Sequence, residues 1–142
     1  MIELEPYLLL PLALVLLLMA LPILSRKIRG PVRYEMPADL ARRLEAGEEV
    51  TLIDLRPEGD FSQGHLAGAI NLAPAALDQS ITDNWAEMEP LKDRPVVVIC
   101  QSDLKSIAAA KRLERRGFSM VLVLKGGMFR WKREHRPLTS EG

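Results

Sequence analysis

Short apolar runs alternate with amphipathic stretches along residues 30–142, and this alternation predicts an α/β domain. Apolar and β-branched runs predict strands at residues 32–34, 50–55, 69–72, 96–99 and 121–124. Helical patterns predict helices at residues 37–45, 60–64 and 106–116, within 74–90, and after Gly126-Gly127. Because strands and helices alternate throughout, we expect a parallel sheet with helices on both faces.

The pattern differs before this domain, where residues 6–25 contain no charged side chain. A helix of this length, at about 1.5 Å per residue, spans the roughly 30 Å hydrocarbon layer of a bilayer. A cleaved signal peptide is the competing interpretation. The chain starts with Glu3 and Glu5 rather than basic residues, however, and it lacks a small-residue cleavage site before Arg26. We therefore predict one transmembrane helix.

Basic residues follow the predicted span and none precedes it; they are Arg26, Lys27, Arg29 and Arg33. Because positive charge favours the cytoplasmic side, we predict a single-pass protein of the inner membrane with its N-terminus outside. Residues 1–29 then form the anchor and its basic flank, and residues 30–142 form a cytoplasmic domain. An anchor concentrates that domain at the membrane surface, so membrane proteins are the expected partners.

Composition narrows the function mainly by what it excludes. The 19 basic and 19 acidic residues balance, which gives no reason to expect nucleic acid. One cysteine excludes an intramolecular disulfide and a multi-cysteine metal site, and it suits a reducing compartment. His65 and His135 are too few and too scattered for a metal site. We therefore expect neither a metal nor a cofactor.

Cys100 is the strongest candidate for chemistry. It follows the predicted strand 96–99 and precedes the mixed stretch 101–106 and a predicted helix. A strand, a tight loop and a helix aim backbone N–H groups and a helix N-terminus at one point, where a thiolate is stabilised. Ligands of parallel sheets bind at the carboxyl ends of strands, where Cys100 and Arg56 both stand. The competing interpretation is a free cysteine that only fills core space.

Three stretches of the domain resemble the signatures of the rhodanese family. In residues 50–72 the matching elements are Asp54-x-Arg56, Asp60-Phe61, Gly64-His65-x-x-Gly68-Ala69 and Asn71. Residues 96–106 resemble the active-site strand and loop of the family. Residues 124–128 with Trp131 resemble its closing signature. The stretches occur in family order, with family-like spacing, and cover nearly all of residues 34–136.

The resemblance implies a five-stranded, mostly parallel sheet flanked by helices, and a sulfurtransferase activity. Cys100 would take sulfane sulfur from a donor such as thiosulfate or a persulfide, carry it as a persulfide, and pass it to a thiol acceptor. The loop that holds this sulfur would consist of Gln101, Ser102, Asp103, Leu104 and Lys105. Structural support would come from Asp54, Arg56, Asp60 and His65. Within that group, Arg56 and Asp60 would form either an ion pair or a solvated surface pair. His65 would hold a turn by hydrogen bonding, with a general base as the competing interpretation.

The loop departs from the family pattern at Asp103, Leu104 and Lys105, where the family often has a glycine, a polar residue and an arginine. Asp103 would be strained in a left-handed backbone. Its carboxylate, at about 5 Å and an effective dielectric near 20, would repel a bound anion by roughly 3 kcal/mol. Lys105 lacks the planar fork with which arginine grips an oxyanion. We therefore do not expect efficient thiosulfate turnover, and a slower transfer from a protein or low-molecular-weight persulfide is the alternative.

Two functions fit these features. The first is a membrane-anchored sulfurtransferase that uses Cys100, and the second is a docking or accessory module of a membrane complex with little or no catalysis. A cysteine phosphatase shares the architecture but requires an arginine six residues after the cysteine. This chain has Ser106 at that position, which argues against a phosphatase.

Overall fold

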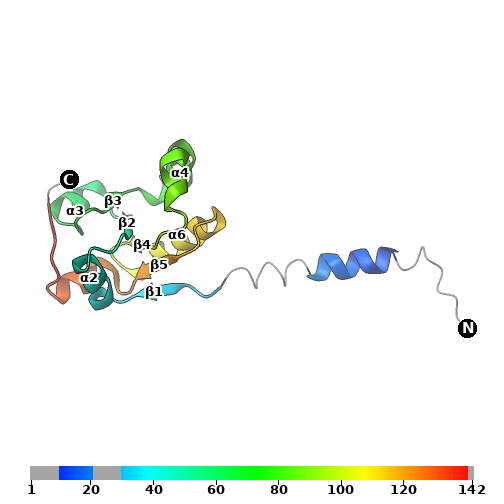
Figure 1. The fold of residues 1–142 in the computed structure, drawn as a ribbon, viewed down its shortest axis with the longest axis horizontal. Helices are drawn as coiled ribbons and strands as arrows, with labels where there is room; N and C mark the ends of the chain where they lie inside the picture. The colour runs from blue at the N-terminus through cyan, green and yellow to red at the C-terminus, as the bar shows by residue number, and fades with distance from the viewer. Residues whose placement is uncertain (1–9, 21–29, 141–142) are drawn as a thin grey trace, which may run out of the picture. The chain divides into compact units, whose positions relative to one another are not determined.

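The computed structural model describes residues 10–20 and 30–140 of the chain (Figure 1). Contacts define two compact units, Met1–Pro31 and Val32–Gly142. In the first unit, residues 10–20 are helical and their side chains are exposed. The rest of the predicted span, residues 6–9 and 21–25, and the basic residues 26–29 lie outside the described residues. Among the helices that the structure describes, none has the length and apolar character needed to cross a bilayer.

The second unit is built on a five-stranded sheet in the order β1-β5-β4-β2-β3. Its strands are β1 (Arg33–Glu35), β2 (Thr51–Asp54), β3 (Ile70–Asn71), β4 (Val96–Ile99) and β5 (Val121–Leu124). All the strand pairs are parallel, which confirms the predicted parallel sheet. The register pairs Asp54 with Ile99 and Val98 with Val123, so the carboxyl ends of β2, β4 and β5 meet at one edge.

Helices connect the strands. They are α2 (Pro37–Glu45), α3 (Glu58–Gln63), α4 (Leu77–Asp83), α5 (Trp85–Met88), α6 (Asp103–Arg115) and α7 (Gly127–Arg133). Buried side chains of α2 and α7 share one hydrophobic core with the sheet, and those of α4, α5 and α6 share the other. Figure 1 shows α2 and α6 on opposite sides of the strands. The sheet is therefore covered on both faces, as predicted.

β4 shows how one strand serves two cores. Val96 and Val98 belong to the core under α6, whereas Val97 and Ile99 belong to the core under α2 and α7. All four residues are buried, because successive side chains of a strand point to opposite faces and both faces are covered. Cys100 continues this alternation, and its side chain joins the core under α6.

The segment between β3 and β4, within which the sequence predicts helical structure, packs against the core under α6. Leu77 and Ile81 of α4 are fully buried in the core under α6. On the surface, the Arg112 Nε of α6 donates a 2.8 Å hydrogen bond to the Asp78 carboxylate. This hydrogen bond, with the nearby charge of Arg116, holds the pKa of Asp78 below its ordinary value. Short 3₁₀ turns, Pro74–Ala76 and Glu89–Leu91, flank the segment.

The end of the chain packs back onto the domain. Thr139 and His65 exchange two backbone hydrogen bonds of 2.8 Å, which form an isolated antiparallel bridge. The indole nitrogen of the buried Trp131 donates to the carbonyl of Pro137 at 3.0 Å. In Figure 1 the C-terminal segment accordingly runs up to α3. These contacts hold the segment that follows α7, the helix that contacts the candidate site.

Candidate active site

Cys100 lies directly after β4, at the edge where the strand ends meet. Its side chain is buried, with 5% of the residue exposed. Only Gln101 and Ser102 separate it from α6, which begins at Asp103. Ser102 is extended, with φ −136° and ψ 179°, and its side chain does not cap the helix. The first turn of α6, whose N–H groups lack intrahelical partners, therefore begins three residues after Cys100.

The structure shortens the loop that the sequence predicts. Asp103, Leu104 and Lys105 form the first turn of α6 instead of an extended loop. A carboxylate in the first turn is stabilised by the helix dipole, which favours this earlier start. The expected left-handed strain at Asp103 is wrong, because His135 is the one non-glycine residue with positive φ in the described part of the chain.

The start of α7 holds the loop in place. Met128 N–H donates a 2.8 Å hydrogen bond to the Cys100 carbonyl, and Phe129 N–H donates a 3.3 Å bond to the Gln101 carbonyl. The approach is close because Gly127 has no side chain, and a Cβ there would lie 2.5 Å from the Cys100 carbonyl oxygen. The carbonyls of the loop are thereby turned toward α7. This contact was not predicted from the sequence, although the paired glycines are its signal.

The Asp103 carboxylate has two partners at the turn between β5 and α7. It accepts a 2.7 Å hydrogen bond from the Gly126 N–H, and it lies 3.3 Å from the Lys125 ammonium. Lys125 also stands over the Tyr34 ring, 4.2 Å from its centroid. The carboxylate expected to repel the bound anion is therefore paired with a cation that sequence reasoning did not place at the site.

The other side chains of the predicted loop face solvent. Gln101, Ser102, Leu104 and Lys105 are exposed, and Leu104 has 79% of its surface accessible. Phe129, whose backbone contacts the loop, is 62% exposed. The Cys100 side chain itself packs in the core under α6, and the Asp103 carboxylate is held at the turn before α7. The exposed side chains surround the site and can contact a molecule that approaches it.

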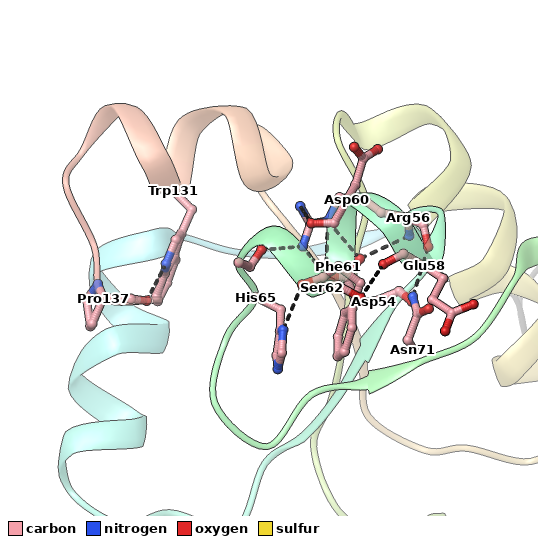
Figure 2. A network of polar contacts seen from close by, with 11 residues as sticks. Asp54, Arg56, Glu58, Asp60, Phe61, Ser62, His65, Asn71, Trp131 and Pro137 are labelled. Atoms are coloured by element: carbon pink, nitrogen blue, oxygen red, sulfur yellow. Dashed lines mark hydrogen bonds and ion pairs between the residues drawn. The ribbon is translucent and has the colours of Figure 1, made fainter. Parts of the chain in front are cut away.

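A buried ion pair supports the neighbouring strand end (Figure 2). The Asp54 carboxylate is fully buried at the end of β2, and it accepts bonds of 3.0 Å from Arg56 Nε and 2.8 Å from Arg56 Nη2. Arg56 also donates to the carbonyls of Gly64 and Asp60. Asn71 donates to the carbonyls of both Asp54 and Arg56. With its hydrogen bonds satisfied, this network ties β2, α3 and β3 together.

Asp60 and His65 take positions within α3 and the turn that follows it. Of the two arrangements considered for Arg56 and Asp60, the ion pair is wrong, because Arg56 reaches the Asp60 backbone carbonyl while the carboxylate is directed away (Figure 2). His65 is buried and its Nδ1 donates to the Phe61 carbonyl at 2.8 Å, since a carbonyl can only accept. Its ring stacks on Phe61 with centroids 3.7 Å apart. These contacts hold the turn and do not direct His65 toward the thiol.

A family model described as the rhodanese-like domain matches residues 36–134, which is most of the chain. The chain belongs to the rhodanese-like domain family. YibN of Escherichia coli strain K12 is 37% identical over 115 residues, covering 81% of this chain and 75% of YibN. The putative sulfurtransferase YtwF of Bacillus subtilis is 34% identical over 101 residues, covering 70% of this chain and 90% of YtwF.

A solved structure of a rhodanese-related protein from Thermoplasma volcanium matches with a TM-score of 0.63 and 27% identity, covering 77% of this chain and 99% of that one. The match supports the same five-stranded α/β architecture. In this rhodanese-like domain, the geometry separates two groups of residues. Cys100 and the start of α6 lie at the carboxyl ends of the parallel strands, while Asp54 and Arg56 support the same edge of the sheet from within the interior.

Replacing Arg56 with methionine should destabilise the domain strongly, because the buried Asp54 carboxylate loses its cation. We expect the free energy of unfolding, measured with urea on the full-length protein, to fall by about 3–5 kcal/mol. Arg42→Ala is the matched control, because it removes an exposed ion pair with Asp39. The control should change stability by no more than about 0.5 kcal/mol. Similar losses in the two variants would contradict a structural role for the buried pair.

Replacing Gly127 with alanine should displace the loop, because the new Cβ would overlap the carbonyls of Cys100 and Gln101. Gly47→Ala is the control for backbone strain alone, since Gly47 has a similar left-handed backbone and a Cβ added there would meet nothing within 4 Å. Urea unfolding should show a loss of about 1–2 kcal/mol for the control and about 1–3 kcal/mol more for Gly127→Ala. Equal losses would show that α7 does not restrain the loop.

Proposed function

We propose that this protein is a sulfurtransferase that carries sulfane sulfur on Cys100. The position of Cys100 carries the proposal, since its thiol lies at the end of β4 and just before the first turn of α6. N–H groups that are already oriented stabilise an anion without reorganisation, and a persulfide is such an anion. Membership of the rhodanese-like family and the likeness to YtwF, a putative sulfurtransferase, support the same chemistry.

The proposed reaction has two displacement steps. In the first, the Cys100 thiolate attacks the outer sulfur of the donor, the donor S–S bond breaks, and the donor remainder leaves with the electron pair. Thiosulfate would leave as sulfite, and a persulfide would leave as its thiolate. In the second step, an acceptor thiolate attacks the outer sulfur on Cys100 and regenerates the Cys100 thiolate. Both steps conserve electrons, so neither requires an external oxidant or reductant.

Incubation of the purified full-length protein with thiosulfate or inorganic polysulfide should add about 32 Da, the mass of one sulfur atom. Intact-mass spectrometry measures this adduct, and peptide mapping should place it on Cys100. Cys100→Ser is the control and should gain no sulfur. A subsequent addition of a low-molecular-weight thiol should remove the added mass from the loaded protein.

The absence of an adduct with both donors would overturn the proposed carrier role. It would favour the alternative in which the domain is a docking or accessory module of a membrane complex. An adduct that also forms on the Cys100→Ser variant would place the sulfur elsewhere and would equally exclude Cys100 as the carrier.

We further propose that residues 6–25 anchor the protein in the inner membrane, with the rhodanese-like domain in the cytoplasm. The uncharged sequence of this segment and the basic residues that follow it support the proposal. Its described part, residues 10–20, is helical and exposes leucine side chains, for example Leu10 with 75% accessible. An exposed apolar surface of this kind requires lipid or another protein to cover it.

The anchor is tested by carbonate extraction of membranes from cells that express the protein. The full-length chain should stay in the membrane pellet, and a variant lacking residues 6–25 should move to the soluble fraction. A fluorescent reporter that folds only in the cytoplasm should be active when fused to the C-terminus. Release of the full-length chain by carbonate, or an inactive reporter beside a stable fusion, would contradict the proposal.

A further inference from the structure

The ion pair between Asp103 and Lys125 lies at the candidate site and has no role in the displacement steps described above. Asp103 is the first residue of α6, and Lys125 directly follows β5. The pair therefore joins the start of α6 to the turn between β5 and α7. The carboxylate is the more enclosed partner, with 25% of its side chain exposed against 43% for the lysine. The Gly126 N–H fixes the carboxylate at 2.7 Å.

The pair lowers the positive charge beside the start of α6, where the proposed function would place the donor anion. Lys125 would otherwise present a free ammonium beside the start of α6, but Asp103 neutralises it. The remaining cation of the first turn, Lys105, is exposed, and water and salt therefore screen its charge. The partial positive charge of the α6 N-terminus remains, and it equals about half an elementary charge. Such a site can stabilise one negative charge better than two.

We propose that the Asp103–Lys125 pair makes the site select singly charged sulfane-sulfur donors, such as organic persulfides and thiosulfonates, over the dianion thiosulfate. This inference rests on the proposed function of Cys100 and defines its donor class. Asp103 and Lys125 act here as specificity-determining residues that set the local charge. The exposed Leu104 and Phe129 near the loop offer apolar contact to an organic substituent, which thiosulfate lacks.

Two donors of similar shape isolate the effect of charge. Methanethiosulfonate carries a methyl group in place of one charged oxygen of thiosulfate, so it has one negative charge instead of two. In each case the Cys100 thiolate attacks the terminal sulfur and the S–S bond breaks. The leaving group is methanesulfinate or sulfite, which departs with the electron pair. The rate of Cys100 persulfide formation with each donor is followed by intact mass, and the ratio of the two rates measures selectivity.

Two single variants of the full-length protein change the local charge by one unit each, a double variant restores it, and a fourth variant is a control away from the loop. Asp103→Asn adds one positive charge and should raise the thiosulfate-to-methanethiosulfonate rate ratio about fivefold, which is about 1 kcal/mol of differential stabilisation. Lys125→Met should lower the ratio by a similar factor. The double variant restores the net charge of the pair and should return the ratio close to that of the unmodified protein. Asp78→Asn removes a carboxylate that pairs with Arg112 away from the loop, and it should leave the ratio unchanged.

The outcomes separate this inference from the proposed function. If neither the unmodified protein nor any variant forms a Cys100 persulfide with either donor, the proposed function fails and the inference fails with it. If both donors load Cys100 but the ratio is the same in all variants, the sulfurtransferase stands and the charge inference is overturned. A ratio that falls in the double variant as far as in Lys125→Met would also overturn it, because a structural effect would then explain the change. A charge effect should shrink in 0.5 M salt, at which the Debye length falls to about 4 Å.

Discussion

The hydrogen bonds from the start of α7 to the carbonyls of Cys100 and Gln101 are the constraint on which the candidate site depends. The three residues between β4 and α6, Cys100 to Ser102, could adopt several paths, and the bonds to α7 select one. They turn the carbonyls toward α7, so these partial negative charges are engaged by N–H groups. The selection requires Gly127, because a side chain there would occupy the space of the loop backbone. The closing signature of the chain is therefore part of the structure of the candidate site, because it positions the loop after Cys100.

A second constraint on the loop comes from β2, the strand that is hydrogen-bonded to β4. Leu55 N–H at the end of β2 donates a 2.8 Å bond to the Ile99 carbonyl, so the position of β2 determines where β4 ends and Cys100 begins. The buried pair of Asp54 and Arg56 fixes that end of β2 against α3 and β3. A buried ion pair costs desolvation free energy, and it persists only where further hydrogen bonds satisfy both groups. Here the backbone carbonyls of the first motif supply those bonds, which explains why the motif combines charged residues with a tight turn.

Sequence reasoning reached the fold and the position of Cys100 because both depend on local patterns. Continuous apolar runs identify strands buried on both faces, and the lone cysteine follows the clearest of them. Reasoning was less successful where contacts join distant segments. Asp103 and Gly126 are separated by 23 positions and meet only when β4 and β5 lie side by side. The start of α6 was misplaced for a related reason: the side chain of its first residue is held by the turn after β5, which no pattern near Asp103 reveals.

In the donor selectivity proposed above, the contact between Asp103 and Lys125 would set the charge of the site without altering its backbone. The cradle consists of main-chain groups and a helix terminus, and these are determined by the sheet, α6 and α7. The charge at the site is instead determined by the side chains of Asp103, at the start of α6, and Lys125, directly after β5. Neither side chain belongs to a hydrophobic core. A substitution at either position changes the net charge and leaves both cores intact. Under that proposal, donor selectivity and stability depend on different residues, so substitutions at Asp103 or Lys125 would change the first and spare the second.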